Sequence, residues 1–184
     1  MTTVTIPQSE ETLARCVRGD ATAFADIVHD HQSMVFSIAY HFLHDRGQAE
    51  EVAQDVFLRL YRRLTSIKSV DHLVFWLRKV TCRCAIDEVR KLPKAPPASL
   101  EDVAEPAAAS HDFDPLLSEG LRRMVASLQD DARAVIILRF QEELDVVEIA
   151  EILDLPINTV KSRLQRSLDM LRDKISRWAG DVQR

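Results

Sequence analysis

Hydrophobic side chains recur every three or four residues through most of this chain, which is the spacing of amphipathic helices. Six such stretches span residues 10–18, 21–43, 49–64, 72–91, 116–127 and 131–141. Only four glycines and 6% aromatic residues argue further against a β-rich fold. The pattern therefore predicts an all-α protein.

Residues 144–166 predict two more helices around a tight turn. Asp145 can cap the first of them, and Glu148 three residues later completes a capping box. Asp154 tolerates the left-handed backbone that ends a helix, and Pro156 fits the first turn of the next. The expected buried stripe of that second helix comprises Val160, Leu164, Leu168, Leu171 and Ile175. This is the helix-turn-helix pattern, whose second helix enters the major groove of DNA.

Charge favours DNA binding for this motif, although two amphipathic helices around a proline turn also occur in ordinary helical bundles. The whole chain carries a formal net charge of −5. Residues 158–177 nonetheless hold six cations and two anions, which leaves four positive charges on one helix. A basic helix on an acidic protein is what contact with phosphates requires.

The composition changes between residues 92 and 114, where four prolines alternate with Ala and Ser. Such a segment forms neither a long helix nor a core. One lysine against five acidic residues gives it a charge of −4. We therefore expect two small helical domains, residues 1–91 and 115–184, joined by a flexible acidic Pro/Ala-rich linker over residues 92–114.

Several other classes of protein fit the sequence poorly. The three cysteines form no disulfide framework, and we find neither a signal peptide nor a membrane-length apolar run, so we expect a cytoplasmic protein. A metal enzyme is a further alternative, because His41, His44 and Asp45 could touch one ion. However, the Glu-x-x-His pairs of di-iron bundles are missing from the sequence. We therefore expect no metal, no cofactor and no enzymatic activity.

Two sets of sequence runs carry a family resemblance. The C-terminal set comprises SLQ at 127–129, AVIILRF at 134–140, VEIAEIL at 147–153, Pro156 and TVKSRL at 159–164. The N-terminal set comprises AEEVAQDVFLRLY at 49–61, FWLRKV at 75–80 and AIDEVR at 85–90. In this order they resemble the two conserved domains of bacterial RNA polymerase sigma factors, in the extracytoplasmic-function (ECF) group of the sigma-70 family. Glu143, Asp154 and Asn158 stand where glycine is common in that family.

The resemblance implies a function and a set of partners. The chain would bind core RNA polymerase and direct promoter-specific transcription initiation. Its partners would be the clamp coiled coil of the β′ subunit, the flap of the β subunit and promoter DNA, with no small-molecule substrate. An anti-sigma factor is a further expected partner, which in some relatives holds the sigma factor at the inner face of the membrane.

The same resemblance implies three sets of site residues. For the minus-thirty-five promoter element they are Asn158, Thr159, Lys161, Ser162, Arg163, Gln165 and Arg166. For the minus-ten element they are Ser69, Asp71, His72, Trp76, Arg78, Lys79 and Arg83. For core polymerase they are Glu51, Gln54, Asp55, Leu58 and Arg59.

A conventional transcriptional regulator with a LuxR-like C-terminal domain is the alternative function, because that family has a similar helix-turn-helix. Its common N-terminal receiver domain alternates strands and helices. Residues 10–91 show no such alternation, which favours the sigma factor.

Overall fold

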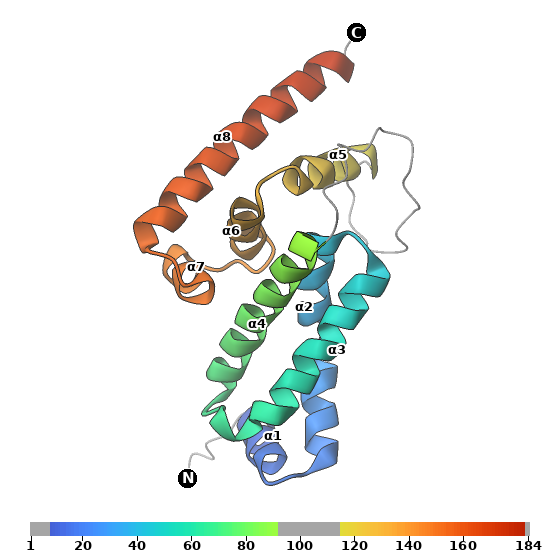
Figure 1. Cartoon of the computed structure of the whole chain (residues 1–184), viewed down its shortest axis with the longest axis vertical. Helices are drawn as coiled ribbons and strands as arrows, with labels where there is room; N and C mark the ends of the chain where they lie inside the picture. Colours follow the sequence, from blue (N-terminus) through green and yellow to red (C-terminus); the bar gives the residue numbers. More distant parts are fainter. Residues whose placement is uncertain (1–7, 92–114, 183–184) are drawn as a thin grey trace, which may run out of the picture.

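The computed structural model describes residues 8–91 and 115–182, and in these ranges it contains helices and short connections but no strand (Figure 1). The N-terminal helices are α1 Gln8–Val17, α2 Ala21–Leu43, α3 Arg46–Arg63, the 3₁₀ turn Leu64–Ser66 and α4 Val70–Lys91. The C-terminal helices are α5 Pro115–Ala126, α6 Asp130–Phe140, α7 Val146–Leu153 and α8 Ile157–Val182. The all-α prediction is confirmed. The predicted linker, residues 92–114, lies outside the described residues, and its flexibility stays a prediction.

Short polar side chains determine where several helices begin. Asp20 and Asp45 each precede a helix and accept hydrogen bonds from backbone N–H groups of its first turn, in α2 and α3 respectively. The predicted capping box at α7 is confirmed: Asp145 accepts from the backbone N–H of Glu148 at 2.9 Å, and Glu148 Oε2 accepts from that of Asp145 at 2.8 Å. These contacts satisfy backbone donors that have no partner inside the helix.

Left-handed backbone conformations occur at helix ends and in one loop. His44, Glu143 and Asp154 have φ values of 53°, 54° and 53°. Asp154 ends α7 as predicted, and its backbone N–H donates to the carbonyl of Ala150. Pro156 lies immediately before α8 and not in its first turn; its carbonyl accepts the first two N–H bonds of that helix at 2.8 and 3.1 Å.

The N-terminal domain is a bundle of α2, α3 and α4, with α1 packed across one end (Figure 1). Its centre is filled by Ile38 and Phe42 of α2, Leu60 of α3, and Leu73 and Leu77 of α4, none more than 2% exposed. Residues of this size spaced three or four apart give each helix one apolar face, and the three faces meet in the core.

In the C-terminal domain, α6 and α7 pack against the first half of α8, where Val160 is fully buried. Figure 1 shows α8 running on past α7 beside α5. There Gly120 of α5 faces the indole of Trp178. The buried stripe predicted for α8 is wrong at Ile175, which is 40% exposed, whereas Leu171 one turn earlier is buried against Leu128 and Ile136.

The two domains are in direct contact. Buried side chains of α6 and α7 belong to the same apolar cluster as those of α2 and α4. Arg133 of α6 is 8% exposed and donates to the carbonyl oxygen of Phe42, at the end of α2, over 3.0 Å. It also donates to the carbonyls of Ala126 and Leu128 at 2.7 and 3.3 Å. One buried guanidinium thus joins the helix ends of both domains.

Candidate nucleic-acid and protein interfaces

The first turns of α8 present an exposed polar face. Asn158, Lys161, Gln165 and Arg166 are exposed, as a contact with DNA requires. Gln165 donates to the carboxylate of Asp169 over 3.1 Å. Within the part of the chain that the structure describes, Lys161 and Arg166 have no ion-pair partner, so their charges are available to a ligand.

Three other predicted contacts of α8 are less accessible. Thr159 and Ser162 are half-buried, and the Ser162 hydroxyl donates to the Thr159 carbonyl at 3.0 Å. The side chain of Arg163 is 28% exposed and turns toward α6, with its Nη1 atom 3.1 Å from Asp131 Oδ2. A base contact by Arg163 would therefore require this ion pair to break.

A basic hollow of about 660 Å³ lies between α3 and α4. It is lined by Arg59, Arg62, Arg63, His72, Phe75, Trp76, Lys79, Val80 and Arg83. The structure thus brings together His72, Trp76, Lys79 and Arg83 of the set predicted for the minus-ten element. Sequence reasoning missed Phe75, Arg62 and Arg63, and it assigned Arg59 to polymerase. The sequence did carry a signal for the arginines, because Arg59, Arg62 and Arg63 are spaced by three and four residues and so share one helix face.

The turn before α4 is ordered by residues that were predicted to contact DNA. The Ser69 hydroxyl accepts from the backbone N–H of His72 at 3.1 Å, and His72 Nδ1 accepts from that of Lys68 at 3.2 Å. Glu10 of α1 accepts from the backbone N–H of Val70 at 3.0 Å. Ser69 and His72 therefore have structural roles at this helix start, whereas Asp71 is exposed.

Cations predicted to contact the minus-ten element are paired with the C-terminal domain. Arg78 does not line the hollow; its Nε donates to Glu142 at 3.1 Å. Lys79 donates to Asp154 at 2.6 Å, and Arg83 forms an ion pair with the second oxygen of the same carboxylate. Sequence patterns within α4 gave no sign of these contacts, because the acids lie more than sixty residues away along the chain.

A largely apolar groove of about 830 Å³ lies on the opposite side of α3, against α2. Its lining includes Leu58 and Tyr61, which are 57% and 61% exposed. The Phe24 ring meets the Tyr61 ring edge to face, with 5.2 Å between their centroids. Gln54 and Leu58 of the set predicted for core polymerase border this groove.

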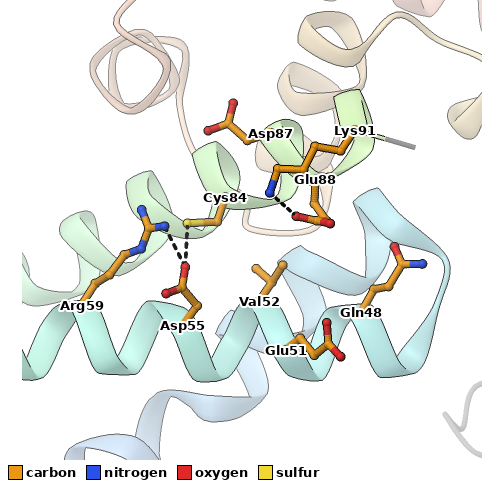
Figure 2. A pocket seen from close by; sticks show the side chains of 9 residues that line it. All are labelled: Gln48, Glu51, Val52, Asp55, Arg59, Cys84, Asp87, Glu88 and Lys91. Atoms are coloured by element: carbon orange, nitrogen blue, oxygen red, sulfur yellow. Dashed lines mark hydrogen bonds and ion pairs between the residues drawn. The ribbon is translucent and has the colours of Figure 1, made fainter. Parts of the chain in front are cut away.

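The other members of that set, Glu51, Asp55 and Arg59, line a polar pocket between α3 and α4, and Asp55 and Arg59 reach toward Cys84 of α4 (Figure 2). Asp55 forms an ion pair with Arg59 at 2.8 Å and lies 4.0 Å from the Cys84 sulfur. Glu51 borders the same pocket. Gln54 and Asp55, predicted to face polymerase together, therefore lie on different sides of α3.

The cysteine beside this pocket is a buried structural residue. Burial is the largest cause that raises the pKa of the Cys84 thiol, and it does the same for Cys16 and Cys82. All three are free and buried. Across residues 8–91 and 115–182, the His, Cys, Asp and Glu side chains form no group of three able to hold a metal ion. In the same ranges, no helix has both the length and the hydropathy needed to cross a membrane.

Comparison with known proteins identifies the family. The model for sigma-70 region 2 matches residues 27–94, and that for sigma-70 region 4 matches residues 118–171. The ECF sigma-E factor of Escherichia coli K12 is 30% identical over 88% of this chain and 91% of its own length. The chain belongs to the ECF group of the sigma-70 family. It is a sigma factor for promoter-specific transcription initiation, and the LuxR-like alternative is wrong.

Other known proteins are similar to this chain over most of its length. The ECF sigma factor SigW of Bacillus subtilis is 28% identical over 86% of this chain and 91% of its own length. Two solved structures share the fold. CnrH, in complex with the cytosolic domain of CnrY, matches with a TM-score of 0.70 at 19% identity, covering 91% of this chain and 97% of that one. RpoE of Bartonella quintana, in complex with the anti-sigma factor NepR, matches with 0.67 at 20% identity, covering 83% and 96%.

Proposed function

We propose that this ECF sigma factor delivers core RNA polymerase to promoters through three separate surfaces. The groove between α2 and α3 binds polymerase, the basic hollow between α3 and α4 binds the minus-ten element, and the first turns of α8 bind the minus-thirty-five element. The observation that carries the proposal is the exposed, cationic start of α8, where Lys161 and Arg166 are unpaired within the described residues.

The start of α8 has the chemistry of direct base readout. In helix-turn-helix proteins the N-terminal residues of the second helix contact base edges in the major groove. Arg166 can form a bidentate pair with guanine, and Gln165 with adenine. Lys161 lies one turn before Gln165 on the same exposed side and suits a phosphate or a guanine.

The hollow between α3 and α4 has the chemistry of a site for single-stranded DNA. Such sites combine cations that follow the phosphates with aromatic rings on which bases stack. Here Arg62 and Arg63 are exposed at the hollow, while Phe75 and Trp76 are half-buried in its wall. The half-buried position lets the Trp76 ring contribute to the domain core and still offer a surface to an unstacked base.

The groove between α2 and α3 suits an apolar helical partner. Leu58 and Tyr61 expose large apolar surfaces beside it, and polar residues such as Gln54 stand at its border. An apolar centre with a polar rim is the ordinary anatomy of a protein interface. We assign this groove to the clamp coiled coil of the β′ subunit. Exposed Phe140 and Val147 in the C-terminal domain would meet the flap of the β subunit.

An anti-sigma factor is a further proposed partner, and the cytoplasm the proposed location. Two structural relatives were solved as complexes, one with the cytosolic domain of CnrY and one with the anti-sigma factor NepR. This chain shares their fold over most of its length, which supports the proposal of such a partner.

Reconstituted transcription tests the proposed function. Purified chain would be added to sigma-free core polymerase, and transcripts from genomic DNA fragments would be mapped. We expect discrete start sites that depend on the chain, each preceded by two shared sequence elements. Transcription that is unchanged when the chain is omitted would refute the function.

A further inference from the structure

One acidic side chain lies on the exposed face of the helix assigned to the minus-thirty-five element. Residues spaced three or four apart form a single exposed stripe along α8. From its start the stripe comprises Asn158, Lys161, Gln165, Asp169 and Arg172. A carboxylate on a surface that meets phosphates repels them, so Asp169 needs a physical reason to lie there.

Asp169 is bonded to its neighbours on both sides along the stripe. Gln165 Nε2 donates to Asp169 Oδ1 and Oδ2, each over 3.1 Å. From the following turn, Arg172 Nη1 donates to Asp169 Oδ1, also over 3.1 Å. All three side chains are exposed, so this network lies where DNA would bind. Arg172 offsets the charge of Asp169 and holds its carboxylate beside Gln165.

The carboxylate determines which way the amide of Gln165 faces. An ionised carboxylate only accepts hydrogen bonds, whereas an amide has an NH₂ end with two donors and a carbonyl oxygen that accepts. Asp169 can therefore bond only to the NH₂ end. Its two oxygens lie in nearly the same direction from Nε2, so one N–H group reaches both. The second N–H group and Oε1 of Gln165 remain side by side, without a partner within the described residues.

An amide fixed in this way is complementary to adenine. In the major groove adenine presents the acceptor N7 beside the donor N6 amino group. The remaining N–H group and Oε1 of Gln165 match these two groups. Guanine presents two acceptors, N7 and O6. An unrestrained amide can turn both N–H groups toward them, but Gln165 held by Asp169 would place Oε1 against one of the acceptors. Restraint of the amide therefore disfavours guanine.

We propose that Asp169 is a positioning residue that sets the base preference of Gln165. It orients the amide for adenine and against guanine at one position of the minus-thirty-five element, while Arg172 holds the carboxylate in place. The inference rests on the proposed assignment of the start of α8 to that element. A bond between Gln and Asp four residues apart also stabilises a helix slightly, so the tests must separate positioning from helix stability.

Asp173 provides a matched control on the same helix. It lies one turn beyond Asp169, is exposed, and within the described residues its side chain has no hydrogen bond or ion pair. Asp169→Ala and Asp173→Ala each remove one carboxylate from α8, but only Asp169 bonds to Gln165. Asp169→Glu keeps a carboxylate able to reach Gln165 and serves as the conservative variant.

The first experiment tests the contact in the full free chain, without DNA. Nuclear magnetic resonance of isotope-labelled chain would follow the two side-chain N–H signals of Gln165, assigned by their loss in Gln165→Ala. Asp169→Ala should move these signals to the positions typical of unbonded amides, because the acceptor is lost. Asp173→Ala should leave them unchanged, and Asp169→Glu should preserve most of the shift. Signals that are the same in Asp169→Ala and the natural chain would overturn the proposed orientation.

The second experiment measures base preference with holoenzyme. Core polymerase carrying each variant would select from copies of one promoter in which the minus-thirty-five element is randomised, and the bound sequences would be counted. For the natural chain we expect one position at which adenine is preferred to guanine by roughly fivefold or more, as for a bidentate base contact. Gln165→Ala and Asp169→Ala should each reduce that preference to within about twofold, at that position alone. Asp173→Ala and Asp169→Glu should retain most of it.

The possible failures of the second experiment are distinguishable. If Gln165→Ala changes the preference but Asp169→Ala lowers affinity equally for every sequence, Asp169 has only a role in helix stability and the positioning role is overturned. The assignment of α8 to the minus-thirty-five element would then stand. If Gln165→Ala leaves the preference unchanged at every position, the assignment of Gln165 to that element fails together with the inference. A preference for another base that depends on Gln165 would overturn the orientation of its amide.

Discussion

His41 lies in the last helical turn of α2, half-buried and with Arg122 of α5 nearby. Burial lowers its pKa to about 4, and the charges of His44 and Arg122 act in the same direction. The unfolded chain therefore binds a proton more readily than the folded one, with an ordinary histidine pKa near 6.5. This contribution to stability is complete above that value and is lost as the pH falls toward 4.

Replacing His41 tests this pH dependence. When the pH is lowered from 7.0 to about 5.5, His41 should reduce the unfolding free energy of the chain by about 1 kcal/mol. His41→Gln should remove that part of the loss, which urea unfolding at the two pH values would measure. An equal loss in both proteins would show that folding does not lower the pKa of His41.

Glu143 adopts a left-handed backbone at a position where glycine is common in the family. A side chain in this conformation costs about 1–2 kcal/mol, and glycine returns part of the gain as extra freedom of the unfolded chain. We expect Glu143→Gly to raise the unfolding free energy by about 0.5–1 kcal/mol. Asp154→Gly relieves the same strain but also removes two ion pairs, so urea unfolding should show a smaller gain or a loss.

At the scale of elements, the first turns of α8 pack one side against α6 and α7 and leave the other side exposed. Arg166→Ala should weaken promoter binding by holoenzyme by about 1–3 kcal/mol if this side chain forms a bidentate base contact. Arg177→Ala removes the same charge near the other end of the exposed side of α8 and serves as the control. Binding to a promoter from the transcription mapping would be compared for both; equal losses would leave only a general charge effect.

The side of α3 that borders the apolar groove gives a prediction for polymerase binding. Leu58 is 57% exposed beside the apolar groove, so Leu58→Ala should change stability by less than about 0.5 kcal/mol. Its co-purification with core polymerase should nevertheless fall, because an apolar contact at the groove is lost. Ile175→Ala, at an exposed position on α8, should bind core polymerase normally. Undiminished binding by Leu58→Ala would move the interface elsewhere.

The helices and their ends were predictable because their causes are local. Helical spacing located α2 completely, and the capping box at Asp145 marked the start of α7. What covers each helix face was not predictable, because the partner is distant in sequence. Ile175 continues the apolar spacing of α8, but it lies beyond the cluster in which Leu171 packs against Leu128 and Ile136. Asp55 was expected to face outward with Gln54, yet Arg59 and α4 hold it on the other side.

At the scale of the whole molecule, the shared apolar cluster predicts cooperative unfolding. Arg133 crosses the boundary and donates to three carbonyl groups, two of them in its own domain. Arg133→Met keeps a long side chain but leaves those buried acceptors unpaired, at a cost of about 1–3 kcal/mol. In low salt we expect one unfolding transition for the natural chain and two for this variant, measured by calorimetry.

Arg139→Met is the control for that experiment. Arg139 lies on the same helix, and within the described residues its one side-chain hydrogen bond is a donation to the carbonyl of Leu144 in its own domain, at 2.9 Å. Arg139→Met should lower the transition temperature, and the chain should still unfold in one transition. Two transitions in the control, or a single transition in Arg133→Met, would show that cooperative unfolding does not depend on the bond between Arg133 and Phe42.

The positions of the two tryptophans give the molecule a built-in optical readout. Trp76 lies in the wall of the basic hollow, and Trp178 lies against Gly120, where α5 meets α8. Each domain thus contains one indole fluorophore. In a chain with Trp178→Phe the indole emission comes only from the surface assigned to single-stranded DNA, and in a chain with Trp76→Phe it comes only from the far end of the helix-turn-helix domain. The occupancy of one surface and the packing of the other domain can be followed separately by their emission, without any attached dye.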